Sequence, residues 1–146
     1  MKISHQLIIN RDREDVWRLF DNPENMKKWQ PSLKKFEHQS GHQGHVGAVS
    51  KLTYEENGRE IVMTETITYR SEPDGFSGEY TTRQAINKIS NYFMKVEDGK
   101  TRWAVDCEFI FNGFLLKLIS PLMKGAIRKR IVKDMNQFKQ LAESQM

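Results

Sequence analysis

Hydrophobic and polar residues follow distinct spacings along the chain, and each spacing predicts one kind of element. Residues 2–9 read as a strand, because most of their apolar side chains fall at odd-numbered positions and share one face. Between residues 12 and 30 the apolar spacing changes to three and four. This predicts two short helices, the first beginning after Asp12 and the second ending before Pro31. From there to residue 112 a period of two returns and predicts about six antiparallel strands.

The dipeptide Asn57-Gly58 predicts a tight hairpin, because both residues tolerate the positive φ of a type I′ turn. Counting outward from this turn pairs Ser50 with Glu65 and gathers the apolar side chains of both strands on one face. That inward face carries Ala48, Ser50, Leu52, Tyr54, Ile61, Met63, Glu65, Ile67 and Tyr69.

A second hairpin is predicted at Asp98-Gly99, where regular pairing sets Met94 opposite Trp103. Its inward face then carries Ser90, Tyr92, Met94, Val96, Thr101, Trp103, Val105, Cys107, Phe109 and Phe111. Between the two hairpins, residues 76–83 form one more strand, with Phe76, Gly78 and Tyr80 on one side.

The C-terminal part of the chain predicts a single long amphipathic helix. Ser120-Pro121 reads as its start, a capping hydroxyl followed by proline at the first helical position, and the helix runs to about residue 143. Its apolar stripe consists of Met123, Ile127, Ile131, Met135, Phe138 and Leu141. The fold class is therefore α+β, with a curved antiparallel sheet of about seven strands around one long helix. Because several inward side chains are small or polar, we expect a cavity between sheet and helix.

Five stretches of the chain, in this order, carry a resemblance to a known superfamily. They are INRDREDVWRLFDNPENMKKWQP, GHVGAVSKLTYEENG, VMTETIT, GKTRW and SPLMKG. In these stretches the chain resembles the START-related, pollen-allergen-like superfamily (SRPBCC) and its polyketide cyclase/dehydrase-like branch. The resemblance implies a helix-grip fold over residues 1–146, as a single domain with a cavity for a hydrophobic or amphipathic molecule. Its members include lipid carriers, hormone binders and aromatase/cyclases, so the fold leaves the activity open.

Glu65 is the foremost candidate for chemistry, because the hairpin register places its carboxylate among inward apolar side chains. Such a group needs a partner, Ser50 or a tyrosine, or its pKa rises. It could anchor a ligand hydroxyl or amine, or act as a general acid or base. The predicted ligand-binding set is Glu65, Ser50, Tyr54, Met63, Tyr69, Phe76, Tyr80, Tyr92, Met94, Trp103, Phe109, Met123 and Ile127.

Other polar and reactive residues have plainer interpretations. Asp134 falls on the helix stripe and is expected to pair with Arg130 one turn earlier, with a ligand contact as the alternative. Cys107 reads as a small inward hydrophobe. The three imidazoles in HQSGHQGH (His38, His42 and His45) match no justified metal-ligand spacing, so no metal and no cofactor are predicted, and this glycine-rich loop could instead gate the cavity.

The composition and charge of the chain limit the classes of partner that we expect it to bind. The chain has 146 residues, of which 38% are hydrophobic, as expected for one domain. Seven bases and one acid lie between residues 117 and 139, which predicts a solvated face, or a weak contact with a membrane surface through Arg128, Lys129 and Lys133. No nucleic-acid partner is expected, and the protein is a monomer or homodimer. One cysteine and no secretory signal favour the cytoplasm.

The sequence therefore predicts a protein that binds a small hydrophobic or amphipathic molecule, such as a lipid, polyketide or isoprenoid, for transport, storage or sensing. Three alternatives stay open. The first is a cyclase/dehydrase or isomerase that uses Glu65 as acid and base, the second is a lipid shuttle at a membrane surface, and the third is a protein-interaction module with a closed cavity.

Overall fold

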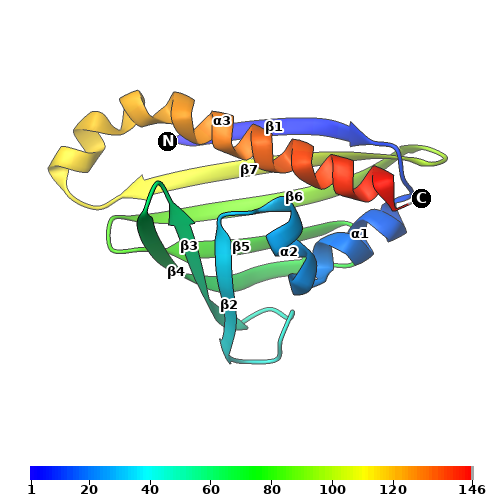
Figure 1. Ribbon diagram of the computed structural model, residues 1–146, viewed down its shortest axis with the longest axis horizontal. Helices are drawn as coiled ribbons and strands as arrows, with labels where there is room; N and C mark the ends of the chain where they lie inside the picture. Colours follow the sequence, from blue (N-terminus) through cyan, green and yellow to red (C-terminus); the bar gives the residue numbers. More distant parts are fainter. Residues whose placement is uncertain (146) are drawn as a thin grey trace.

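A computed structural model describes residues 1–145, and within this range it contains a seven-stranded sheet, two short helices and one long helix (Figure 1). The elements are β1 (Lys2–Ile9), α1 (Arg13–Asp21), α2 (Pro23–Trp29), β2 (Leu33–Ser40), β3 (Val49–Glu56), β4 (Arg59–Ser71), β5 (Gly75–Thr81), β6 (Ala85–Glu97), β7 (Lys100–Phe111) and α3 (Phe114–Ser144). The predicted fold class is confirmed.

The sheet is antiparallel throughout, in the order β1-β7-β6-β5-β4-β3-β2. The first strand of the chain therefore pairs with the last, and β2 and β3 lie at the opposite edge. The helix α3 crosses the sheet, packing on β1, β7 and α2, while α1 and α2 lie at the end where α3 finishes (Figure 1). Strands β3 to β6 are thus left without direct cover from α3, which creates the hollow described below.

The first hairpin forms as the sequence predicts. Asn57 and Gly58 adopt φ values of 51° and 76°, and Ser50 lies opposite Glu65. The register preserves the expected inward face as far as Ile67. Beyond Ile67 a bulge interrupts the pairing of β4 with β5, so that Tyr69 turns outward and is 45% exposed. The predicted inward position of Tyr69 is wrong for this reason.

The second hairpin contains a bulge that the sequence analysis did not anticipate. Glu97 pairs with Lys100, but the register then shifts at Val96, so that Lys95 lies opposite Thr101 and Phe93 opposite Trp103. A one-residue shift moves every side chain of a strand to its other face. The predicted inward side chains on β6 (Ser90, Tyr92, Met94 and Val96) are therefore wrong, and Asn87, Ile89, Asn91 and Phe93 lie inward instead.

The long helix begins earlier than Ser120-Pro121 predicts. It begins at Phe114, and Pro121 lies inside it. Proline has no N–H to donate to the carbonyl of Lys117, four residues earlier. The hydroxyl of Ser120 donates to that carbonyl instead, at 3.0 Å. The Ser-Pro pair is thus accommodated within a continuous helix, and the predicted start at residue 120 is wrong.

An aromatic cluster at the α1–α2 end holds the long helix to the sheet. Phe138 of α3 is fully buried, and its ring centroid lies 5.0 Å from that of Trp103 and 5.3 Å from that of Trp29. Phe20 meets Phe93 at 5.1 Å in an edge-to-face arrangement. Such pairs add stabilisation beyond the burial of their area. The hollow begins at this cluster, since Phe20, Trp29 and Trp103 also line it, and it extends under the middle of α3.

Candidate functional site

A cavity of about 870 Å³ lies between the concave face of the sheet and α3. This volume is within the range of about 300–1,000 Å³ that is typical of small-molecule sites. Strands β3 to β7 supply most of the lining, and α1, α2, β2, α3 and the loop around Gly44 supply most of the rest. The residues that α3 contributes are Ala126, Ile127, Arg130, Ile131, Asp134 and Met135.

The strand register arranges the cavity floor in rows of different polarity. One row, which we call the polar row, crosses four strands and consists of Ser50, Glu65, Tyr80 and Asn87. The next row along the strands is apolar and contains Ile67, Gly78, Ile89 and Cys107. Beyond it lie Phe76, Asn91 and Val105, followed by the aromatic cluster. The cavity floor therefore has a polar row with apolar side chains on both sides of it, including Met63 on one side and Ile67 on the other.

Glu65 and Tyr80 form the centre of the polar row. Glu65 is 4% exposed and accepts a 2.7 Å hydrogen bond from the hydroxyl of Tyr80. Burial raises the pKa of Glu65 although this hydrogen bond opposes the shift. Burial and the neighbouring Glu65 raise the pKa of Tyr80, which remains a donor. Of the predicted partners for Glu65, the tyrosine is confirmed.

The ring of Tyr80 reaches this position because residue 78 has no side chain. A Cβ atom at Gly78 would come within 3.2 Å of Cε2 of Tyr80 and 3.3 Å of its hydroxyl oxygen. Such a separation is shorter than ordinary van der Waals contact. Gly78 therefore lets the ring fold over the strand and aim its hydroxyl at Glu65.

Three further polar atoms of the lining residues are buried and have no hydrogen-bond partner in residues 1–145. One is Oε1 of Glu56, which forms an ion pair with Arg130. The other two are the amide oxygen Oδ1 of Asn87 and the indole nitrogen Nε1 of Trp29. By contrast Asn91, also on the wall, accepts from Nε1 of Trp103 at 3.1 Å. Leaving a buried polar atom unpaired costs about 1–3 kcal/mol. An acceptor at Asn87 and a donor at Trp29 are thus available to a bound molecule.

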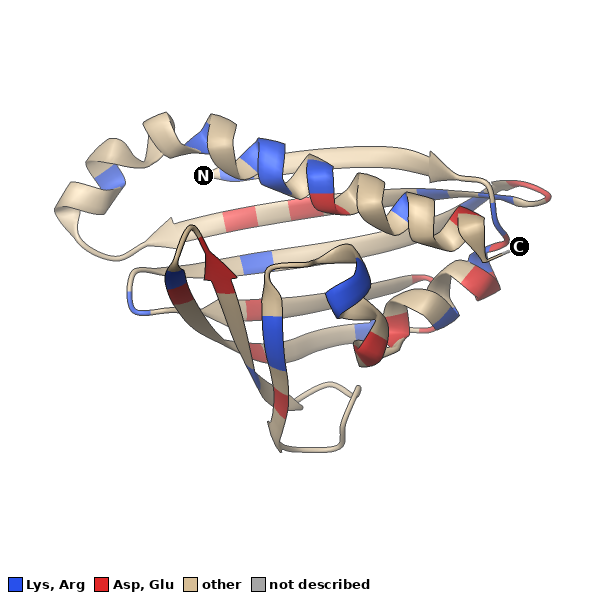
Figure 2. Ribbon diagram, viewed as in Figure 1, with Lys and Arg blue, Asp and Glu red and all other residues tan. Residues whose placement is uncertain are grey.

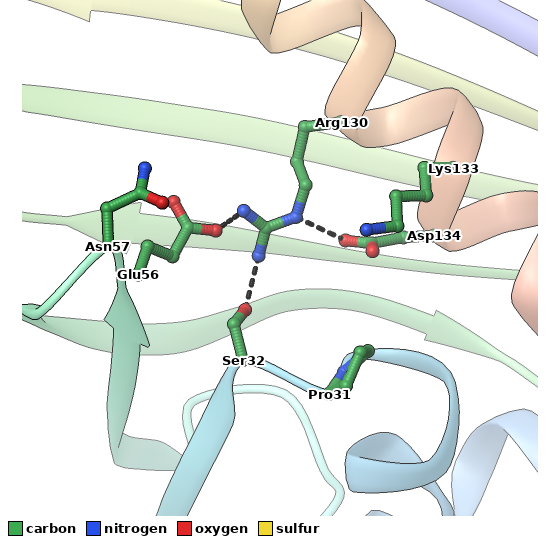
Figure 3. A pocket seen from close by; sticks show the side chains of 7 residues that line it. All are labelled: Pro31, Ser32, Glu56, Asn57, Arg130, Lys133 and Asp134. Carbon is green, nitrogen blue, oxygen red and sulfur yellow. Dashed lines mark hydrogen bonds and ion pairs between the residues drawn. The ribbon is translucent and has the colours of Figure 1, made fainter.

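Arg130 links α3 to the opposite rim of the cavity. Figure 3 shows its guanidinium between Glu56 at the end of β3, Ser32 before β2, and Asp134 one helical turn away. Its Nε lies 3.2 Å from the carboxylate of Asp134, which confirms the predicted ion pair. Burial raises the pKa of Asp134 while Arg130 opposes the shift. A recess of about 300 Å³ on this rim shares Glu56, Arg130 and Asp134 with the main cavity.

Nine predicted ligand-binding residues line the cavity: Ser50, Tyr54, Met63, Glu65, Phe76, Tyr80, Trp103, Phe109 and Ile127. Tyr69, Tyr92 and Met94 are 41–45% exposed and lie outside it because of the two bulges. Met123 is half-buried but also lies outside the lining. The hydroxyl of Tyr54 donates to Gln30 at 2.8 Å, so this tyrosine already has a partner.

The histidine loop lies near the rim of the cavity and shows no metal cluster among the described residues. His45 lines the cavity, whereas Nε2 of His38 lies 2.8 Å from the carbonyl oxygen of Gly41. Arg70 ties the loop to α1 by bonding Gly44 and Asp21. Cys107 is buried on the floor, where burial raises the pKa of its thiol to about 12. The thiol therefore remains protonated at neutral pH, as expected of a small hydrophobe.

A sheet that is hollow on its concave face and spanned by one long C-terminal helix defines a helix-grip protein. Residues 1–143 match the family described as "Polyketide cyclase / dehydrase and lipid transport", and the chain belongs to this family. The resemblance to a polyketide cyclase/dehydrase-like family is thereby confirmed. Among curated proteins, none matches the chain significantly.

Solved structures share the fold at low sequence identity. The Zhui aromatase/cyclase from Streptomyces sp. R1128 is 13% identical, with a TM-score of 0.82 over 98% of this chain and 93% of its own. A START superfamily protein from Mycobacterium smegmatis is 13% identical, with a TM-score of 0.76 over 96% and 98%. Norcoclaurine synthase from Thalictrum flavum, solved with dopamine and hydroxybenzaldehyde, is 12% identical, with a TM-score of 0.74 over 100% and 88%. These likenesses show the fold alone.

The raised pKa of Glu65 predicts a pH-dependent effect on stability. Because the folded-state pKa lies above the usual 4.5, ionised Glu65 disfavours the folded state above that pKa, and protonation relieves the cost as the pH falls. Glu65→Gln should therefore stabilise the protein near neutral pH, by about 1.4 kcal/mol per unit of raised pKa. The gain should shrink on acidification toward the ordinary value.

Urea unfolding of both proteins at several pH values between about 8 and about 5 measures this difference. Glu79→Gln, on the outer face of the neighbouring strand, is the control and should show no such trend. A stability difference for Glu65→Gln that stays constant with pH would mean that Glu65 titrates normally.

Proposed function

We propose that this protein binds a small amphipathic molecule in the cavity between its sheet and α3. The observation that carries the proposal is the cavity itself, about 870 Å³ of space that the protein's own side chains do not fill. Protein interiors otherwise leave few voids larger than a water molecule. A lipid-like, polyketide-like or isoprenoid-like body fits the apolar rows, and transport, storage or sensing is the role that such a site serves.

The polar row defines the ligand's functional group. The carboxyl group of Glu65 and the unpaired Oδ1 of Asn87 are acceptors, so they favour a hydroxyl or amine that donates hydrogen bonds. The indole N–H of Trp29 favours an acceptor oxygen farther along the molecule. Family membership is consistent with this ligand class, since the family description includes lipid transport.

Native mass spectrometry of freshly purified protein provides the direct test. We expect a co-purifying mass that dissociates at higher collision energy and is absent after denaturation and refolding. An apo mass in every preparation, together with no binding of small apolar probes, would contradict the proposal.

Glu65→Leu should abolish the preference for a hydrogen-bond donor. Wild-type protein is expected to bind 2-naphthol more tightly than 2-methoxynaphthalene, because only the naphthol can donate to Glu65. A hydrogen bond to a charged group contributes about 1.5–3 kcal/mol, which corresponds to about ten- to hundredfold in Kd. In Glu65→Leu the two Kd values should become nearly equal.

Isothermal titration calorimetry measures both constants, and Glu79→Leu on the outer face of β5 serves as the matched control. A preference for naphthol that survives in Glu65→Leu would exclude Glu65 as the anchor while leaving the cavity as a binding site.

An enzyme of the cyclase/dehydrase or isomerase type is the second candidate. The observation that favours it is the buried Glu65–Tyr80 pair, in which a carboxyl group and a phenol lie 2.7 Å apart on the cavity wall. A carboxylate with a raised pKa can accept a proton from an enolisable substrate. Turnover that disappears in Glu65→Ala while substrate binding persists would favour this role over simple binding.

A further inference from the structure

The first turns of α3 expose a group of large apolar side chains that the fold does not cover. Four of them are 64–85% exposed: Phe114, Leu115, Leu118 and Leu122. Ile119 beside them is 37% exposed. Single apolar residues on a surface are normal, but a contiguous group on one helix face is typical of an interaction site. We call residues 114–122 the apolar start of α3.

This segment is exposed because the helix begins before it reaches the sheet. Strand β7 ends at Phe111, and Gly113, with a φ of 89°, turns the chain into α3. Figure 1 shows the first turns of α3 extending past the ends of the neighbouring strands. Within residues 1–145, the buried side chains of α3 all lie in its second half, at Met135, Phe138 and Ala142.

The charge of this half of the helix is entirely positive. Between residues 114 and 133 there is no acidic residue and there are six bases, of which Lys117, Lys124, Arg128, Lys129 and Lys133 are exposed. Figure 2 shows basic residues at several places along α3. At about 100° per residue, the five apolar side chains fall within an arc of about 140°, and Lys117, Lys124 and Arg128 lie along one side of that arc. An apolar face flanked by bases is the pattern of a helix that lies in a membrane interface.

We propose that the apolar start of α3 docks on the surface of an anionic lipid bilayer. The five apolar side chains insert at the boundary between headgroups and acyl chains, and the flanking bases contact lipid phosphates. A second copy of this chain fits less well, because a symmetric contact would bring two sets of bases together with no acid between them. No helix within residues 1–145 is long and apolar enough to cross a membrane, so the contact is peripheral.

Vesicle flotation with purified protein tests the proposal. Vesicles of phosphatidylcholine containing phosphatidylglycerol should bind the protein at least about tenfold more tightly than pure phosphatidylcholine vesicles, and added salt should weaken the binding. The double variant Leu118→Gln/Leu122→Gln should lose at least about tenfold, since each leucine buries an apolar side chain in the bilayer. Lys124→Glu/Lys129→Glu should lose the preference for anionic vesicles.

The double variant Tyr92→Gln/Met94→Gln is the matched control, because it removes two exposed apolar side chains from the outer face of β6. It should bind vesicles like the wild type. Failure of the wild type to bind anionic vesicles would overturn the proposal. So would a concentration-dependent dimer, seen by analytical ultracentrifugation, that is lost in Leu118→Gln/Leu122→Gln, since the face would then be a contact between copies.

The docking surface is separable from the cavity, since none of residues 114–122 lines it. Glu65→Leu should therefore float with anionic vesicles as the wild type does. A variant that loses vesicle binding should still bind 2-naphthol, so the two proposals can fail independently.

Discussion

Replacing Phe138 by alanine should lower the free energy of unfolding by about 3–5 kcal/mol, the usual cost of removing a buried phenylalanine. Phe138 is fully buried and contacts the rings of Phe20, Trp29 and Trp103. It is the side chain of α3 that joins the helix to both short helices and to the sheet. Urea unfolding followed by tryptophan fluorescence measures the loss, because Trp29 and Trp103 report on this cluster.

Phe114→Ala provides a matched control on the same helix, since Phe114 is 82% exposed. Its effect should stay within about 0.5 kcal/mol, as is usual for surface substitutions. A loss below about 1 kcal/mol in Phe138→Ala would mean that the aromatic cluster relaxes around the cavity and that α3 is held elsewhere.

The two hairpins show which part of the sheet was predictable from sequence. Asn57-Gly58 fixes both the turn and the register, and the residues beyond it alternate without interruption, so the position of Glu65 follows by counting. Asp98-Gly99 fixes its turn equally well, yet the bulge at Val96 shifts the register after one pair. A bulge is set by strand twist and curvature, and Val96 carries no glycine or proline signal that would mark it.

Residues of the candidate site were predicted correctly on the strands whose register was predicted correctly, and were missed on β6. Glu65 and Tyr80 lie on strands that were counted correctly, and the sequence analysis names both. Asn87 and Ile89 were missed, because their strand was read one position out of register. The β7 residues Trp103 and Phe109 were placed correctly, since the inserted residue lies on β6.

The start of α3 was mispredicted for a different reason. A serine followed by proline is a good helix start, but the Ser120 hydroxyl also satisfies the carbonyl that Pro121 leaves without a donor. The same signal therefore fits two structures, and only the tertiary path after β7 distinguishes them. The six additional residues ahead of Ser120 include Phe114, Leu115, Leu118 and Ile119, which make up most of the exposed apolar face.

Filling the cavity should weaken binding strongly without harming the fold. Ile89 lies on the floor and Ala126 on the helix above it, and both line the cavity. In Ile89→Trp/Ala126→Trp the two indole rings would remove about 100 Å² of apolar wall from a bound molecule. At about 25 cal/mol per Å² this loss is about 2.5 kcal/mol, or about 70-fold in Kd. The neutral fluorescent probe N-phenyl-1-naphthylamine measures the loss by titration.

Stability separates cavity filling from misfolding in this experiment. Added side chains that occupy an empty, apolar space gain contacts, so the Tm of Ile89→Trp/Ala126→Trp should equal or exceed that of the wild type. Tyr92→Trp/Met94→Trp places two indoles on the outer face of β6 and should leave probe binding unchanged. A lower Tm together with unchanged probe affinity would contradict the prediction. It would mean that the interior between the sheet and α3 is already packed, because side chains added to a packed interior destabilise the protein.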